Sequence, residues 1–222
     1  MKSPTHLELI ETMRWSRKDA RRPSGGYFLL DLHLDRLEAS ARFFGFSLDL
    51  AKIEMALAEL EKSLMKRGEE TFLVRLLMRK DGTFHLEERI IPSRMDQPVA
   101  VDISSHRVNS SDPFLYHKTT RRQLFDKERK RLTQKGLYET IFLNEKGELT
   151  QGTITNIFLD MKGPRLVTPP LECGLLPGTL RRHLLDTAKA SEQVLTLEDL
   201  KQASRVFVGN SVRGLLLADV RI

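Results

Sequence analysis

The 222-residue sequence contains a single cysteine and no long apolar run. Cys173 has no partner for a disulfide within the chain, and no set of cysteines and histidines recurs at metal-ligand spacing, so we expect neither disulfides nor a bound metal. Nowhere do 18 apolar residues follow one another, and the opening MKSPTHLELIE has no apolar stretch after its basic residue. These absences predict a cytoplasmic protein with neither a membrane span nor an export signal.

The composition is that of an ordinary globular protein with a positive net charge. Hydrophobic residues make up 40% and charged residues 30% of the chain, which is enough for one large domain or two small ones. The formal net charge of +6 favours an anionic partner. Nucleic acid, a phosphorylated cofactor and an acidic metabolite all satisfy that condition, and charge does not choose among them.

The first hundred residues combine helical and extended patterns. Apolar residues recur at helical spacing over 31–45, where Asp31 is the expected N-cap and Gly45 the expected end. A second helix is predicted from Asp49. Two extended runs around a Lys-Asp-Gly turn then predict a β-hairpin within 71–90.

A polar, turn-rich stretch divides the chain. The segment SSHRVNSSDP suggests an N-terminal α+β domain over 1–103, a linker over 104–115 and a C-terminal α+β domain over 116–222. In the second half, the pattern predicts a helix over 120–135. Extended runs, a helix in LLPGTLRRHLLDTAKA and two final strands in RVFVGNSVRGLLLADV follow.

Two turns in the second half suit an anion. In LLPGTLRRHLL, a Pro-Gly turn leads into a helix whose first N–H groups, on Thr179 and Leu180, lack partners within that helix. In GNSVRG, a bend with Asn210, Ser211 and Arg213 follows an apolar strand. Simple helix capping and an ordinary turn are the alternatives.

The stretch YHKTTRRQLFDKERKR is strongly basic. Cations such as Arg121 and Arg122 would lower the pKa of Lys118 and favour the neutral amine that forms a Schiff base. A solvated helix face is the alternative. Nucleic-acid binding has little support, because few aromatic residues interleave with the basic ones and no binding motif is present.

Six blocks along the chain carry a family resemblance. LIETMRW, LHLDRLEASARFFGF, YHKTT, NEKGELTQGTITNIF, GLLPGTLRR and VGNSVRG resemble, in order and spacing, the class IV aminotransferases, which are pyridoxal-phosphate (PLP) enzymes of fold type IV. The resemblance implies an α+β fold like that of D-amino acid and branched-chain aminotransferases, with the cofactor in a cleft between two domains. Within the family, the blocks are most similar to 4-amino-4-deoxychorismate lyases, especially the lyase part of chains fused behind aminodeoxychorismate synthase.

The resemblance also implies roles for individual residues. Lys118 would be the catalytic Schiff-base lysine, Arg36 would reach the cofactor phosphate, and Leu176 would pack on the pyridine ring. The cofactor-binding set is Arg36, Lys118, Gln151, Thr155, Asn156, Leu176, Gly178, Thr179, Leu180, Asn210 and Ser211. Candidate substrate contacts are Trp15, Tyr116, His117 and Arg213. Alternatively, Arg36 pairs with an acid on its own helix, Leu176 belongs to the core, and Thr155 and Asn156 are ordinary polar strand residues.

The chain departs from the family pattern in two places. Gln151 stands where the family usually has a glutamate that keeps the pyridine nitrogen protonated. Its amide N–H can only bind an unprotonated nitrogen, which leaves a weaker electron sink and favours elimination over amino transfer, or else signals lost activity. The segment before Glu11-Thr12 is also short, so we expect an edge strand of the family to be absent.

The sequence therefore predicts a PLP-dependent aminodeoxychorismate lyase that yields 4-aminobenzoate and pyruvate. The expected partners are a small anionic substrate, a second copy in a homodimer and an aminodeoxychorismate synthase, with no nucleic acid and no membrane. The alternatives are an aminotransferase of branched-chain or D-amino acids, and a non-catalytic anion- or nucleic-acid-binding protein on the same fold.

Overall fold

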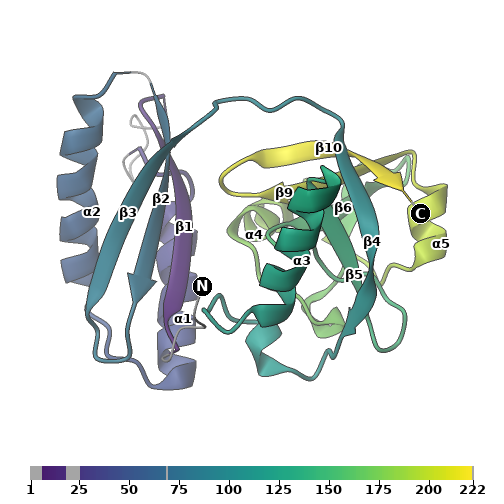
Figure 1. Cartoon of the computed structure of the whole chain (residues 1–222), viewed down its shortest axis with the longest axis horizontal. Coiled ribbons are helices and arrows are strands. Elements are labelled where there is room, and N and C mark those ends of the chain that lie inside the picture. The colour runs from purple at the N-terminus through teal and green to yellow at the C-terminus, as the bar shows by residue number, and fades with distance from the viewer. Residues whose placement is uncertain (1–6, 19–25, 69, 222) are drawn as a thin grey trace. The chain divides into compact units, whose positions relative to one another are not determined.

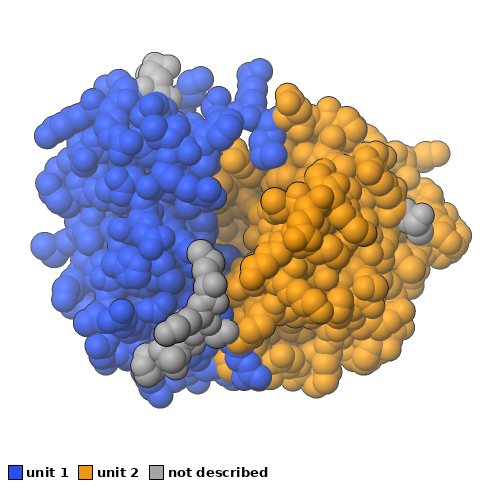
Figure 2. Space-filling model, in the orientation of Figure 1, with its two compact units in different colours: residues 1–95, 118–121 blue, residues 96–117, 122–222 orange. Residues whose placement is uncertain are grey.

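The computed structural model describes residues 7–18, 26–68 and 70–221. The chain forms two compact units, coloured separately in Figure 2. Unit 1 comprises residues 1–95 with 118–121, and unit 2 comprises residues 96–117 with 122–222. Each unit contains a sheet and helices, so the predicted α+β class is confirmed.

Unit 1 is a three-stranded antiparallel sheet with two helices on one face (Figure 1). Its elements are β1 (Leu9–Ser16), α1 (Leu30–Phe44), α2 (Leu50–Met65), β2 (Thr71–Met78) and β3 (Phe84–Ile91). The strand order is β1-β2-β3, and Glu11 of β1 lies opposite Leu76 of β2. Alternate β1 residues, Leu9, Met13 and Trp15, point into the core that the helices cover.

The local predictions for unit 1 hold with one difference. Asp49 caps α2 through Lys52 N at 3.0 Å, Gly45 ends α1 in the left-handed region, and β2 and β3 form the predicted hairpin. Asp31, however, is not the N-cap of α1. That position is Leu29, which has a φ of 59°. Asp31 lies in the first turn, where its negative charge interacts favourably with the positive end of the helix dipole.

Unit 2 is built on a seven-stranded mixed sheet in the order β5-β4-β10-β9-β6-β7-β8 (Figure 1). Its strands are β4 (Val99–Val108), β5 (Glu139–Asn144), β6 (Asn156–Asp160), β7 (Leu166–Thr168), β8 (Ala190–Glu192), β9 (Arg205–Asn210) and β10 (Gly214–Arg221). Its helices are η1 (Pro113–Leu115), α3 (Gln123–Lys135), η2 (Leu171–Cys173), α4 (Thr179–Asp186) and α5 (Leu197–Gln202). None of the helices in the described ranges has both the length and the apolar character needed to cross a bilayer.

The division between the units differs from the predicted domain boundaries. Residues 104–108 of the expected linker complete β4, which pairs with β5 as far as Val108, and η1 follows within 109–115. The first boundary falls instead at residues 95 and 96. Polar side chains of the segment hold the turn that follows β4, where Ser111 N and Oγ both donate to Asn109 Oδ1.

The sequence predicted that Lys118 belongs to the C-terminal domain, but Lys118 groups with unit 1. Residues 118–121 run beside β1, where Leu9 and Thr119 form an antiparallel bridge. For the same reason α3 begins at Gln123 and not at Thr120, because backbone hydrogen bonds hold Lys118 and Thr120 against residues 8–10.

Candidate active site

Lys118 lies on the extended segment that runs beside β1 in unit 1. Its carbonyl oxygen accepts a hydrogen bond from Ile10 N at 2.8 Å, and Thr120 N donates to Glu8 O at 3.0 Å. Glu8 N donates to the Thr120 hydroxyl at 3.0 Å. The backbone on both sides of Lys118 is therefore fixed, and the residue itself is half-buried.

A buried ion pair joins β1 to α1 in the same unit. Arg36 Nε donates to Glu11 Oε1 at 2.9 Å, and Arg36 Nη2 donates to Glu11 Oε2 at 2.6 Å. His33 Nδ1 lies 2.6 Å from the same Oε2. Glu11 is 2% exposed and His33 0%. Arg36 thus pairs with a buried acid on the neighbouring strand, and not with an exposed acid on its own helix.

The protonation states in this cluster follow from burial and charge. Burial alone would raise the pKa of the Glu11 carboxyl, but the charge of Arg36 and the contacts with His33 outweigh it and lower this pKa to about 2. Burial lowers the pKa of His33, and the charges of Arg36 and Lys118 contribute to the same effect despite the opposing influence of Glu11. His33 is therefore neutral at pH 7 and donates its Nδ1 proton to the carboxylate.

Acid should destabilise unit 1 through these two groups. The unfolded chain takes up protons at His33 near its ordinary pKa of 6.5 and at Glu11 near 4.5, whereas the folded chain takes them up only at lower pH. The free energy of unfolding should therefore fall as the pH drops below 6.5, and more steeply from 4.5 toward 2. The Glu11 contribution is about 3 kcal/mol over the full window. Urea unfolding over a pH series measures this; a free energy that stays level or rises on acidification contradicts it.

In unit 2, Gln151 and Asn156 face each other across a tight turn and both bind the backbone of Leu176. Leu176 N donates to Gln151 Oε1 at 3.0 Å, and Asn156 Nδ2 donates to Leu176 O at 3.1 Å. Because a backbone N–H can only donate, this contact identifies the oxygen of the Gln151 amide. The other end of that amide is a donor, and Gln151 is 6% exposed.

The N-terminus of α4 lies beside β6 and β9. Gly178 is its N-cap, and no side chain caps the helix. A Cβ atom on Gly178 would overlap Asn156 Oδ1, so only glycine fits without a shift. A Cβ atom on Gly209, which pairs with Asn156 in the sheet, would lie 3.1 Å from Leu180 Cδ2. The start of α4 therefore packs against the end of β9.

Replacing Gly178 with alanine should destabilise unit 2. The added methyl group forces Asn156 away and strains its hydrogen bond to Leu176, at a cost of about 1–3 kcal/mol in the free energy of unfolding. Gly163→Ala is the matched control, because the nearest atom to its Cβ lies at 3.9 Å. Urea unfolding of both variants measures the difference, and equal stabilities would refute the close packing at Gly178.

The bend after β9 is shaped by one side chain. Asn210 Oδ1 accepts from Val212 N at 3.0 Å and from Arg213 N at 2.9 Å, while Asn210 Nδ2 donates to Ile154 O at 3.1 Å. Ser211, within the bend, is 5% exposed. Both predicted anion-binding turns, this bend and the start of α4, thus lie at the C-terminal end of β9.

Glu139 is a buried carboxylate that sequence reasoning missed. It is 0% exposed, and its Oε1 accepts from Thr140 N at 3.0 Å, Thr153 N at 2.8 Å and Thr153 Oγ1 at 2.6 Å. Its Oε2 accepts from Ile154 N at 3.1 Å and Thr155 Oγ1 at 3.0 Å. Glu139 therefore holds the turn between Gln151 and Asn156. An acid at the start of the apolar run ETIFLN was the only sequence signal.

Two predicted residues have structural partners in this turn. The Thr155 hydroxyl directs its hydrogen to Glu139, which leaves only its acceptor capacity for a cofactor. Arg122, expected to tune Lys118, donates to Thr153 O at 2.9 Å and to Asp126 Oδ1 at 2.8 Å within unit 2.

The prediction that Trp15 contacts the substrate is wrong. Its side chain is 0% exposed in the core of unit 1, where its ring packs edge-on against Phe72 with centroids 5.8 Å apart. The indole N–H donates to Glu61 Oε1 at 3.2 Å. The alternation of β1 places Trp15 on the helix-covered face, which the sequence pattern alone did not assign.

The other candidate substrate contacts lie in unit 2 and stay predictions. Tyr116 is half-buried, and its hydroxyl donates to Ser110 O at 2.6 Å. His117 is half-buried, and burial lowers its pKa. Arg213 N contributes to the bend after β9.

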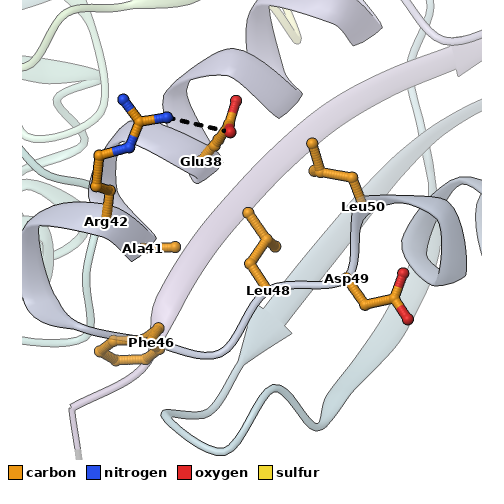
Figure 3. A pocket seen from close by; sticks show the side chains of 7 residues that line it. All are labelled: Glu38, Ala41, Arg42, Phe46, Leu48, Asp49 and Leu50. Atoms are coloured by element: carbon orange, nitrogen blue, oxygen red, sulfur yellow. Dashed lines mark hydrogen bonds and ion pairs between the residues drawn. The ribbon is translucent and has the colours of Figure 1, made fainter.

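A hollow on unit 1 lies at the end of α1 and the start of α2 (Figure 3). It is lined by Glu38, Ala41, Arg42, Phe46, Leu48, Asp49 and Leu50. Glu38 and Arg42 form an ion pair at 3.3 Å along α1. No predicted cofactor or substrate residue lines the hollow, so it is not the candidate site. Within the described ranges, no three or more His, Cys, Asp or Glu side chains are grouped to hold a metal ion.

Known proteins resemble this chain over nearly its whole length. Residues 8–218 match the family described as amino-transferase class IV. A crystal structure of a "Putative amino-acid aminotransferase" from Mesorhizobium loti is 37% identical, with a TM-score of 0.83 over 97% of this chain and 100% of that chain.

Two curated relatives carry different activity names. A "Putative aminodeoxychorismate lyase" of Schizosaccharomyces pombe is 26% identical over 85% of this chain and 82% of its own length. A "Putative branched-chain-amino-acid aminotransferase" of Methanocaldococcus jannaschii is 27% identical over 83% of this chain and 70% of its own length. Both names belong to one family, and the match over residues 8–218 means that the chain belongs to the class IV aminotransferases.

Proposed function

We propose that the protein is a pyridoxal-phosphate-dependent lyase that converts 4-amino-4-deoxychorismate to 4-aminobenzoate and pyruvate. The family contains PLP-dependent lyases and aminotransferases, and the S. pombe relative is named for the lyase. The single observation that carries the choice of lyase is the fixed orientation of the Gln151 amide.

The donor groups of the chain suit a phosphorylated aldehyde. In unit 2, the N–H groups of Thr179 and Leu180 at the start of α4 and the hydroxyl of Ser211 are proposed to bind phosphate. In unit 1, the guanidinium of Arg36 is proposed to bind phosphate, and the amine of Lys118 to hold the aldehyde carbon. Each of these groups is a cation or a hydrogen-bond donor, as the two ends of the cofactor require.

Lys118 is the proposed acid and base. Bound PLP supplies an aldehyde that condenses with primary amines and a ring that withdraws electrons from the adjacent bonds. Lys118 Nζ takes the proton from the amine-bearing carbon of the substrate, and the bond from the neighbouring ring carbon to the enolpyruvyl oxygen breaks. The proton passes to the leaving enolpyruvate, which becomes pyruvate. The atoms of 4-aminobenzoate and pyruvate together equal those of the substrate, and formation of the aromatic ring drives the step.

The Gln151 amide supports elimination over amino transfer. Its oxygen accepts from Leu176 N, so the amide offers N–H donors to other groups. A donor stabilises an unprotonated pyridine nitrogen and not a protonated one, which weakens the ring as an electron sink. Amino transfer needs a long-lived carbanion that the ring must stabilise, whereas the lyase step is drawn forward by aromatisation.

The alternative reaction is amino transfer to a keto acid. The M. loti and M. jannaschii relatives are both named as aminotransferases, which keeps this reaction as the second candidate. A non-catalytic protein of the same fold is the third. Steeply salt-dependent binding of DNA or RNA without cofactor uptake would favour that one. Homodimer formation, a synthase partner and a cytoplasmic location stay predictions.

A substitution at residue 151 tests the choice of reaction. Pyruvate release from 4-amino-4-deoxychorismate should need no keto acid in the wild-type enzyme. Gln151→Glu keeps an oxygen for Leu176 N and adds a carboxylate oxygen where the amide nitrogen stood, so the ratio of amino transfer to elimination should rise roughly tenfold. Both rates are measured with coupled assays. Keto-acid-dependent turnover by the wild type without pyruvate release would replace the lyase by the aminotransferase.

A further inference from the structure

Glu11 and His33 have no part in the reaction just proposed, yet both are buried beside residues that do. Both carboxylate oxygens of Glu11 bind side chains of α1 in unit 1: Arg36 donates two hydrogen bonds and His33 donates one. Burying a carboxylate is costly unless its partners satisfy it. Packing of α1 on the sheet does not by itself require a buried acid at this position, so we look for a further role of Glu11.

The geometry fixes the plane of the Arg36 guanidinium. Nε and Nη2 donate to the two oxygens of Glu11 at 2.9 and 2.6 Å, which is the bidentate arrangement of an arginine and a carboxylate. Arginine has a long, freely rotating side chain, and this arrangement removes most of that freedom. The edge that carries Nη1 is consequently held in one direction.

His33 in turn holds the carboxylate. Its neutral ring donates Nδ1–H to Oε2, the oxygen that also accepts from Arg36 Nη2. Glu11 and Arg36 together carry no net charge, and His33 adds none. Arg36 can therefore act on an anion chiefly through directed N–H groups, since Glu11 offsets much of its charge. The affinity of such an oriented guanidinium for an anion depends mainly on the direction of its N–H groups. That affinity should therefore depend on the groups that orient the guanidinium.

We propose that Glu11 is a positioning residue that orients Arg36 toward a phosphate monoester, and that His33 keeps Glu11 in place. This inference rests on the proposed function, because the phosphate is that of the cofactor. It assigns to the Glu11–His33–Arg36 cluster the part of the cofactor affinity that depends on the phosphate group.

Comparing two ligands isolates that part. Pyridoxal phosphate and pyridoxal share the aldehyde and the ring, and only the first carries a phosphate. Affinities for both are measured from the visible absorbance of the Lys118 adduct, in the wild type and in Arg36→Ala, Glu11→Gln and the double variant. Glu11→Gln should weaken pyridoxal phosphate about tenfold or more and leave pyridoxal unchanged, because an amide cannot accept on both atoms. In the Arg36→Ala background, the same change should have no further effect on either ligand.

Glu61→Gln is the matched control in the same unit. Glu61 accepts from Trp15 Nε1 and from Gly26 N through a single oxygen, Oε1, which a glutamine retains. The affinity of the Glu61→Gln variant for both ligands should equal that of the wild type. An equal loss for both ligands in Glu11→Gln, or unchanged or stronger binding of pyridoxal phosphate, would overturn the proposal.

Variants of His33 decide the matter if Glu11→Gln does not fold. His33→Leu removes the donor to Glu11 but leaves the Arg36 contacts, and should weaken pyridoxal phosphate several-fold. His33→Asn supplies a donor where Nδ1 stood and should restore the affinity. If neither His33 variant differs from the wild type, Glu11 does not depend on His33 and the proposal fails. A wild-type protein that takes up neither ligand on Lys118 refutes the proposed function itself, which is a separate outcome.

Discussion

Replacing Lys118 with alanine should abolish cofactor attachment and reduce the rate of pyruvate release by roughly 10²–10⁴-fold. The amine is the proposed anchor for the aldehyde and the proposed carrier of the proton, so one truncation removes both. The fold should persist, because alanine retains the carbonyl oxygen of residue 118 that accepts from Ile10 N. Borohydride reduction of the loaded protein, followed by peptide mapping, tests the attachment.

Lys127→Ala is the control for this experiment. Lys127 lies nine residues further along the same basic stretch and is exposed on α3. Its removal should leave the visible band, the reduced label on Lys118 and the rate unchanged. A label spread over surface lysines, or a Lys118→Ala variant that retains both band and activity, would exclude Lys118 as the anchor.

Replacing Glu139 with glutamine should lower the free energy of unfolding by about 2–4 kcal/mol. Five donor groups converge on its two oxygens: three N–H groups and two hydroxyls. A glutamine would bring its own N–H₂ against some of these donors, and no water reaches a side chain that is 0% exposed. Because the turn 152–155 joins Gln151 to Asn156, cofactor affinity should fall as well.

A surface glutamate provides a closely matched comparison. Glu145 accepts from Ser110 N at 2.8 Å and from Ser110 Oγ at 2.6 Å, the distances that Glu139 shows to Thr153 N and Oγ1. Glu145 is exposed, so water can replace lost partners and Glu145→Gln should lower the free energy of unfolding far less than Glu139→Gln does. Urea unfolding of both variants measures the difference. Equal losses would show that burial does not set the contribution of Glu139.

Local patterns predicted the elements of this protein well. The apolar stripe of α1, the Asp49 cap of α2 and the Lys-Asp-Gly turn between β2 and β3 all depend on residues within one or two turns of chain. The start of α3 and the expected linker were placed wrongly for one common reason. Backbone pairing with β1 in the first case and with β5 in the second overrides the local composition.

The sequence indicated some features of the candidate site and missed others. Lys118, Gly178 and the bend at Asn210 and Ser211 stay predicted site residues, and the sequence pointed to them through short blocks that resemble the family. The sequence did not reveal that Trp15 faces the core, since that depends on which face of β1 the helices cover. Nor did it reveal Glu139, whose partners lie up to 16 residues away in the chain.

The sequence by itself determined the family, the α+β class, and most of the helices and strands. Those features are read from short blocks and from spacing. Only the tertiary structure decided that Glu11 pairs with His33 and Arg36, that the Gln151 oxygen binds Leu176 N, and that residues 118–121 join unit 1. The physical reason is that a buried polar group must find its partners wherever the fold brings them, and these partners come from separate elements that meet only when the chain is folded.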